Sequence, residues 1–328
     1  MKNSITRTFK YTFTKTHRLI AVTATLTLFL TLMAFMAGCN NESNNSRIIV
    51  ADARTTHHLN LYVAYELGFF TERGLDVEII QVDDLSAARD LVVSGGADVF
   101  WTCPTVAIAA IANGAPLQTI AQVKAPCTSV LLVPEDSPIQ TLADLDGKDI
   151  AGASPTCEAV ISLDLAANEA GASFNLQNMS GGAAIAALQA GAIDGAILEE
   201  PQASIAELAG FKVLFREVAE SVPCRTINAS NSAISNNADN LIKFIQAVDE
   251  ANSVILADPI AENIVDIAVE YTGAPSEAVI HGNHLLLFDT KILSDGLFML
   301  ADELVNMGDI SENPRYNMFA DIFRGITW

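Results

Sequence analysis

The chain has 328 residues, half of them hydrophobic, and its 18 basic and 39 acidic residues give a formal charge of −21 at pH 7. A surface with this much negative charge repels nucleic acid and anionic lipid headgroups. Neither is therefore an expected partner. About 280 residues follow the N-terminal region described next, and at roughly 100–200 residues per domain they predict two lobes.

The first 38 residues have the pattern of an export signal. A head with five basic residues and no acid precedes an apolar run from Leu19, which ends in Ala37-Gly38 before Cys39. This ending resembles a bacterial lipobox, in which Cys39 becomes the lipidated first residue of the mature protein. The prediction is an exported protein, anchored to the outer face of the cell membrane or in the periplasm. The alternative is an uncleaved anchor, since the run is about long enough to span a bilayer.

Residues 39–46 are predicted to form a flexible tether, because they are polar and lack apolar periodicity. Five of the 18 basic residues precede Cys39, so the mature chain carries 13 basic against 39 acidic residues and a formal charge near −26. Such acidity is typical of a solvated surface and does not identify a substrate.

From Arg47 onward, short apolar strands alternate with helices. The predicted order is a strand at 48–50, a helix at 57–67, strands at 77–82 and 98–102 separated by a helix at 86–93, and a helix that begins at Pro104. Repeated strand–helix units of this length predict a largely parallel sheet covered by helices on both faces.

The same unit recurs later in the chain, with strands at 149–152, 174–179 and 196–198 and helices at 156–169 and 183–190. A local echo relates the two halves. Gly95-Gly-Ala-Asp98 and Gly191-Ala-Ile-Asp194 each end a helix with glycine and open a strand with aspartate. Two similar α/β lobes are therefore predicted, and the chain after Asn237 is expected to be mainly helical and to pack around the first lobe.

Two extended segments, 127–134 and 224–230, are predicted to connect the lobes. Two lobes joined by paired strands form a hinge, with the ligand held between the lobes. The predicted boundaries are 47–127 plus 225–328 for the first lobe and 128–224 for the second.

Several of these segments resemble a known family. They are the run HLNLYVAYELGFFTERGLDVE at 58–78, Gly95 to Asp98, DSPI at 136–139, and GAIDGAILEEP at 191–201. They look like the substrate-binding proteins of nitrate, sulfonate and taurine ABC importers, a superfamily that includes thiamine-pyrimidine precursor binders. The resemblance implies a type II periplasmic-binding-protein fold, with two parallel-type sheets joined by a two-strand hinge.

The same resemblance implies a function. The chain is expected to be an extracytoplasmic solute-binding lipoprotein that closes on a small organic solute and delivers it to an ABC permease and its ATPase. The solute is expected to be anionic or zwitterionic, either sulfonate- or taurine-like or pyrimidine-like. No cofactor is expected.

Ligands of open α/β sheets bind at the carboxyl ends of strands and against helix N-termini. Three loops meet this condition, and their amide hydrogens and hydroxyls favour an anionic group. Simple helix capping is the alternative for each hydroxyl. Trp101 is expected either to stack on an organic ligand or to belong to the core. The candidates are Arg54, Thr55, Thr56 and His57; Trp101, Thr102, Cys103 and Pro104; and Ser154, Thr156 and Cys157.

Charged candidates complete the predicted site. Glu199 and Glu200 follow a strand of the second lobe, and a carboxylate pair there would favour a ligand with an amine or ring nitrogen. Arg54 and Arg225 are expected either to pair with a ligand carboxylate or to be surface charges.

Four cysteines remain besides Cys39, and their even number in an exported chain permits two disulfides with three connectivities. Cys127 and Cys224 are the favoured pair, because both would lie on the hinge strands. Closing that loop stabilises by roughly 4–5 kcal/mol in the chain-entropy model. Cys103 and Cys157 are expected to face each other from opposite lobes, where they contact the ligand or a soft metal or are simply buried.

The alternative function is an iron- or metal-dependent enzyme, or a metal-binding protein, on the same fold. It would use His57, His58 and the cysteines, as the resemblance to thiamine-pyrimidine synthases suggests. The sequence has no clustered-cysteine motif, no HExxH and no Ser/His/Asp set. We therefore expect a binding protein without enzymatic activity.

Overall fold

The computed structural model describes residues 46–124, 127–216 and 222–320. These residues belong to one compact unit. The predicted signal, the predicted lipidation site Cys39 and all of the predicted tether except Ser46 lie outside the described residues. Within them, no helix combines the length and apolar character needed to cross a bilayer.

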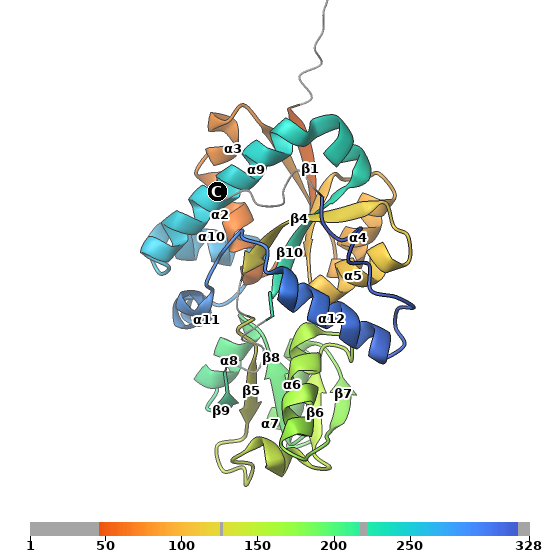
Figure 1. The fold of residues 1–328 in the computed structure, drawn as a ribbon. Coiled ribbons are helices and arrows are strands. Elements are labelled where there is room, and N and C mark those ends of the chain that lie inside the picture. The colour runs from red at the N-terminus through yellow and green to blue at the C-terminus, as the bar shows by residue number, and fades with distance from the viewer. Residues whose placement is uncertain (1–45, 125–126, 217–221, 321–328) are drawn as a thin grey trace, which may run out of the picture. The chain divides into compact units, whose positions relative to one another are not determined.

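Two five-stranded sheets organise this unit (Figure 1). Sheet 1 has the order β2 (Asp76–Gln81), β1 (Arg47–Asp52), β3 (Val99–Thr102), β10 (Arg225–Ser230) and β4 (Leu117–Lys124). Sheet 2 has the order β7 (Asn175–Asn178), β6 (Asp149–Gly152), β8 (Gly195–Leu198), β5 (Val130–Val133) and β9 (Lys212–Phe215). We call the residues around sheet 1 lobe 1 and those around sheet 2 lobe 2.

Both sheets are mixed. β1 runs parallel to β2 and β3, and β6 runs parallel to β7 and β8, as the alternation of strands and helices predicts. β10 is antiparallel to both of its neighbours, and so is β5. These two reversed strands are the ones that the chain enters as it crosses from one lobe to the other, which is why the repeated units alone did not reveal them.

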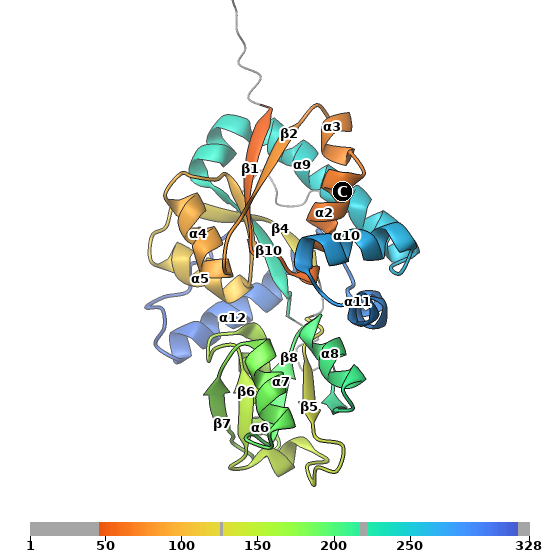
Figure 2. The same cartoon turned by 180° about the vertical axis from the view of Figure 1, so that it is seen from behind.

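Helices cover both faces of each sheet (Figure 2). Lobe 1 contains η1 (Thr56–His58), α2 (Leu59–Glu66), α3 (Phe69–Glu72), α4 (Leu85–Val93) and α5 (Pro104–Ala112). Lobe 2 contains η2 (Leu142–Leu145), α6 (Glu158–Glu169), α7 (Gly181–Gln189) and α8 (Gln202–Leu208). The C-terminal part forms α9 (Asn231–Ala257), α10 (Glu262–Thr272), α11 (Ser276–Gly282), η3 (Asn283–Leu285) and α12 (Ser294–Asn306).

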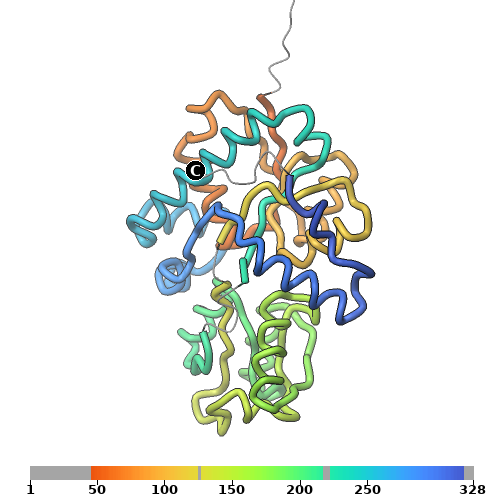
Figure 3. Tube along the Cα trace, viewed as in Figure 1, coloured from red at the N-terminus to blue at the C-terminus, as the bar shows by residue number. Residues whose placement is uncertain are grey.

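The C-terminal helices contact both lobes, whereas the sequence led us to expect packing on the first lobe alone. α9 and α10 pack on α2, as expected. However, α11 packs on α8 of lobe 2, and α12 lies between α5 and α6 (Figure 3). Amphipathic spacing shows that a helix buries one face but not which lobe supplies the partner, so this difference could not be read from the pattern.

The echo between the two halves has a structural meaning. Asp98 and Asp194 stand just before β3 and β8. The carboxylate of Asp98 accepts the amide hydrogen of Ile49 at 2.9 Å, and that of Asp194 accepts the amide hydrogen of Asp149, also at 2.9 Å. Each aspartate therefore ties the start of its own strand to the adjacent parallel strand of the same sheet.

The chain crosses between the lobes twice, and the two crossings lie side by side. The amide of Cys224 donates to the carbonyl of Lys124 at 3.0 Å, and the amide of Cys127 donates to the carbonyl of Val222 at 2.9 Å. Beyond these bonds the segments diverge, because β5 joins sheet 2 and β10 joins sheet 1. The hinge is therefore a short pair of crossings rather than two strands paired along 127–134 and 224–230.

Candidate functional site

A cavity of about 240 Å³ is lined by residues of both lobes. It lies where the chain leaves β1 and β8 and where α4 begins. We call it the larger cavity. Its lining residues are Ala53, Arg54, Thr55, Asp84, Leu85 and Thr272 of lobe 1, Glu199, Pro201 and Gln202 of lobe 2, and Arg225 of β10.

A smaller cavity of about 80 Å³ lies in lobe 2 and shares Glu199 and Gln202 with the larger one. Its other lining residues are Ser129, Ala153, Cys157, Ala159, Val160, Met179, Gly181, Ile197 and Leu198. This lining is mostly apolar, whereas the larger cavity presents two arginines and two carboxylates.

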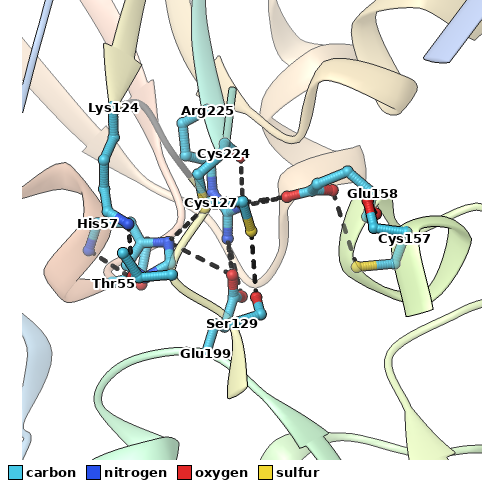
Figure 4. Close-up of polar contacts among 12 residues, drawn as sticks. Thr55, His57, Lys124, Cys127, Ser129, Cys157, Glu158, Glu199, Cys224 and Arg225 are labelled. Atoms are coloured by element: carbon cyan, nitrogen blue, oxygen red, sulfur yellow. Dashed lines mark hydrogen bonds and ion pairs between the residues drawn. The ribbon is translucent and has the colours of Figure 1, made fainter. Parts of the chain in front are cut away.

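Arg225 is the buried charge at the centre of the site (Figure 4). Its Nη2 donates to both oxygens of Glu199, at 2.7 and 2.8 Å, and its Nη1 donates to Oε1 of Glu158 at 3.1 Å. Nη1 also donates to the carbonyl of Cys224 at 2.8 Å. A buried guanidinium needs such compensation, and here two carboxylates from lobe 2 supply it to a strand of lobe 1.

His57 is fully buried beside this ion pair. Its Nδ1 lies 3.3 Å from a carboxylate oxygen of Glu199 and 3.3 Å from Sγ of Cys224. Burial, together with the charges of Arg225 and Lys124, holds the pKa of His57 well below its usual value. The imidazole is therefore neutral at neutral pH, so one ring nitrogen has a free lone pair.

His58, by contrast, faces the interior of lobe 1. Its Nδ1 lies 2.7 Å from Oδ1 of the buried Asp52, and the hydroxyl of Tyr62 donates to the other oxygen of that carboxylate at 2.8 Å. His58 lines neither cavity. Among the described residues, His58 serves as a hydrogen-bond partner for the buried carboxylate of Asp52.

Cys103, Cys127, Cys157 and Cys224 gather at this site as free cysteines. They form two hydrogen-bonded pairs. A hydrogen bond from Cys224 lowers the pKa of the Cys127 thiol to about 6, and one from Cys103 lowers that of Cys157. The pKa of Cys224 and of Cys103 is raised correspondingly by the same bonds. The predicted partners are therefore neighbours, and the Cys127–Cys224 disulfide itself stays a prediction.

Glu158 and Lys124 belong to the site although the sequence analysis did not select them. Glu158 is the first residue of α6, and its side chain is 1% exposed. Desolvation by burial raises its pKa well above the usual value. Lys124 ends β4 and donates to the hydroxyl of Thr128. An acid in the first turn of a helix next to a candidate cysteine was the signal available for Glu158, but it fits simple helix-dipole pairing equally well.

Two candidates face away from both cavities. Trp101 is fully buried and packs edge-on against Phe244, with ring centroids 5.8 Å apart, so it is a core residue of lobe 1. Glu200 accepts the amide hydrogen of Ser204 at 3.2 Å and lies against Gly282 of α11. Only Glu199 of the predicted carboxylate pair therefore lines the cavities.

The remaining candidates have local roles. Pro104 is the first residue of α5, and Cys103 precedes it as the N-cap. Ser154 and Thr156 bring their hydroxyls within 3.3 Å of each other in the turn before α6. Thr56 and Thr102 are buried, and neither hydroxyl has a hydrogen-bond partner among the described residues. Of the loop residues, Arg54 and Thr55 line the larger cavity and Cys157 lines the smaller one.

Two overlapping sets of side chains could hold a metal ion within the described ranges. One is His57, Glu199 and Cys224, and the other is Cys127, Glu158 and Cys224. In each set the donor atoms lie within 4.8 Å of one another, and Cys224 is common to both.

The chain is similar to a known protein family. Residues 55–262, more than half of the chain, match the family model described as NMT1/THI5 like. The chain belongs to this family. The match begins at Thr55 and takes in the four cysteines, His57 and Arg225. The matched region therefore includes Arg225 and the side chains that contact it, Glu158, Glu199 and Cys224.

Individual proteins give the same picture. YtlA of Bacillus subtilis (strain 168), which carries the name of a binding protein, is 28% identical over 231 residues, covering 67% of this chain and 69% of YtlA. The 4-amino-5-hydroxymethyl-2-methylpyrimidine phosphate synthase THI11 of Saccharomyces cerevisiae (strain ATCC 204508 / S288c) is 30% identical over 97 residues. That match covers 29% of this chain and 28% of THI11.

Among solved structures, the periplasmic aliphatic sulphonate binding protein SsuA from Escherichia coli has a TM-score of 0.74. The two sequences are 18% identical, and the alignment covers 84% of this chain and 92% of SsuA. The fold of this NMT1/THI5-like protein is thus that of the type II periplasmic binding proteins, as the sequence motifs predicted.

Proposed function

We propose that this protein is the solute-binding lipoprotein of an ABC importer. It would capture a small solute between its lobes, close around the two crossings, and present the closed form to a permease and its ATPase. The observation that carries the proposal is the larger cavity, because it is lined by charged side chains from both lobes. The family match and the fold shared with SsuA support it.

The lining of the cavity favours a zwitterionic solute. Arg225 is already neutralised by Glu199 and Glu158. Arg54 is exposed on the cavity wall, and no ion pair joins it to another described residue. Its guanidinium is therefore the group for a ligand sulfonate or carboxylate. The carboxylate of Asp84, which also lines the cavity, is then the group for an amine or a ring nitrogen on the same ligand.

The size of the cavity points in the same direction. Cavities for drug-sized ligands occupy about 300–1,000 Å³, whereas this one has about 240 Å³. A compact solute such as an aminosulfonate of the taurine type, or a substituted aminopyrimidine, is the class that we propose.

Calorimetric titration of the full chain with three matched solutes tests this proposal. The first is a short aminosulfonate, the second is the same sulfonate without the amine, and the third is the same amine without the sulfonate. We expect the aminosulfonate to bind more tightly than either truncated compound. The compound without the amine leaves the cavity carboxylate without a partner, and the compound without the sulfonate leaves Arg54 without one. Equal binding of all three, or of none together with no binding of an aminopyrimidine, would contradict the proposed ligand class.

An enzyme is the second candidate, and the similarity to THI11 is the observation that favours it. That similarity covers 28% of THI11, so the synthase activity does not follow from it. Mass spectrometry of the solute recovered after prolonged incubation separates the two functions. A binding protein returns the solute unchanged, whereas an enzyme returns a product.

A further inference from the structure

We propose that Cys127, Cys224, His57 and Glu158 form a binding site for a thiophilic divalent metal ion such as Zn²⁺ where the chain crosses between the lobes. This site does not depend on the identity of the organic solute or on the importer function. Its four side chains come from different segments: η1, the two crossings, and the first residue of α6.

The positions of the donor atoms carry the inference. Sγ of Cys127, Sγ of Cys224 and a carboxylate oxygen of Glu158 lie within 4.8 Å of one another. His57 Nδ1 adds a fourth donor 3.3 Å from the same Cys224 sulfur. In a tetrahedral zinc site, ligand atoms about 2.0–2.3 Å from the metal are about 3.3–3.8 Å apart. The donor atoms of Cys127, Cys224 and Glu158 are thus close to this spacing and need a contraction of about 1 Å, and His57, which groups with Cys224 and Glu199, would complete the set on binding.

The donor set also selects the metal. Two thiolates and an imidazole are soft and borderline ligands, which suit Zn²⁺ and disfavour Mg²⁺ and Ca²⁺. All four side chains are buried. A fully protein-enclosed set of four ligands is typical of a structural rather than a catalytic zinc site.

The nearby cations do not exclude a metal. Arg225 donates to Glu158 and lies 3.6 Å from Sγ of Cys224, and Lys124 ends the strand before the first crossing. A divalent ion with two thiolates and one carboxylate carries one net negative charge. The positive side chain of Arg225, in contact with two of the ligands, is placed to compensate that charge.

The consequence for the molecule is a link across the hinge. His57 belongs to lobe 1, Glu158 begins a helix of lobe 2, and the two cysteines lie on the crossings. An ion bound by all four side chains would fix the lobes in one relative orientation and would resist opening.

Metal titration of the full chain tests the proposal. The chain is purified in a mild detergent, stripped with a chelator and kept reduced with a phosphine, so that no disulfide competes. We expect one equivalent of Zn²⁺ to bind, and Co²⁺ in its place to give a sulfur-to-cobalt charge-transfer band. Loss of an outer partner of a metal ligand already weakens binding by roughly 10–100-fold, so Cys127→Ser and Cys224→Ser should each weaken it at least as much.

Cys103→Ser is the matched control, because Cys103 is in the same cluster but in neither donor set. It should leave the Zn²⁺ affinity and the cobalt band unchanged. Alkylation of the wild-type chain gives a second readout that no folding defect can imitate. Because Cys127 and Cys224 are buried, the comparison is between the metal-free and the Zn²⁺-loaded chain: Zn²⁺ should lower the alkylation rates of these two thiols and leave that of Cys103 unchanged. Absence of stoichiometric binding, an equal loss in Cys103→Ser, or protection of Cys103 and Cys157 instead would overturn the proposal.

Discussion

Arg225 of β10 and Glu199, which follows β8, form a two-pronged ion pair at 2.7 and 2.8 Å that joins the two lobes. The guanidinium is 1% exposed, and its other nitrogen holds the buried Glu158. Both binding proposals depend on this arrangement. It leaves Arg54 as the cation for a ligand anion, and it places a positive charge next to the thiol cluster.

Replacing Arg225 with methionine should destabilise the protein strongly. The variant leaves Glu158 buried without its charged partner, and breaking a buried ion pair in this way costs about 3–5 kcal/mol. Denaturant unfolding measures the effect. Arg89→Met is the control, because the ion pair of Arg89 among the described residues is with its neighbour Asp90 on the surface, and Arg89 lines neither cavity. If the two variants were equally stable, the central role of Arg225 would be refuted.

Replacing Arg54 with glycine should separate binding from stability. Arg54 has a φ of 51°, a left-handed conformation that glycine adopts without strain. The relief of strain and the added freedom of the unfolded chain roughly cancel, so unfolding should change by no more than about 1 kcal/mol. Solute binding, in contrast, should weaken markedly in a calorimetric titration. Retention of full affinity would show that another group receives the anion.

The stability of lobe 1 should fall at alkaline pH, in part because of Tyr62. Burial, together with its bond to Asp52, raises the pKa of Tyr62 well above the usual value. Above about pH 10 the unfolded chain releases this proton while the folded chain keeps it, so the free energy of unfolding decreases as pH rises. Tyr62→Phe should reduce that slope in denaturant unfolding, whereas Tyr316→Phe, at a side chain 93% exposed, should not. An unchanged slope in Tyr62→Phe would contradict this assignment.

The contact between α11 and α8 should be sensitive to a single methyl group. A Cβ added at Gly282 would collide with the Glu200 carboxylate and the Ser204 hydroxyl. We expect Gly282→Ala to destabilise by about 1–3 kcal/mol. Gly182→Ala is the matched control, since Gly182 lies in α7 facing open space and should gain about 0.5–1 kcal/mol of stability. Thermal unfolding compares the two variants. A Gly282→Ala variant as stable as the wild type would show that Glu200 and Ser204 can move aside without cost.

Lipidation at Cys39 is tested in cells rather than on the structure. We expect the mature chain to begin at a diacylated cysteine and to be found with the membrane fraction, as the lipobox motif predicts. Cys39→Ala should then release the protein or leave the signal uncleaved. Mass spectrometry of the mature N-terminus measures this directly. An unmodified N-terminus in the wild type would favour the membrane-anchor alternative.

The fold could be predicted in large part because its signals are local. Alternating strands and helices located the elements within a few residues, and the repeated Gly–Asp motif indicated two similar lobes. Asp98 and Asp194 then proved to make the same backbone contact in each lobe. The reversal of β5 and β10 was not predictable in this way, because strand direction depends on where the chain crosses and not on the residues of the strand.

The site was harder to predict than the fold. Glu199 and Glu200 are adjacent in sequence, yet only Glu199 lines a cavity, because Glu200 turns toward Ser204 and Gly282 instead. Trp101 packs against Phe244 in the core of lobe 1. The sequence pattern could not distinguish this role from stacking on a ligand. Glu158 became recognisable only when the fold brought α6 next to Arg225.

Thermal unfolding of the full chain against a panel of small solutes tests the central claim most directly. The panel contains aminosulfonates, alkanesulfonates, amino acids, aminopyrimidines and nitrate. A ligand at a hundred times its dissociation constant stabilises a protein by about 2.7 kcal/mol, which is a shift of several degrees for lobes of this size. We expect such a shift with one zwitterionic class, lost in Arg54→Gly and present in Arg89→Met, and the solute recovered unchanged. No shift with any solute, or conversion of the solute to a product, would contradict the account.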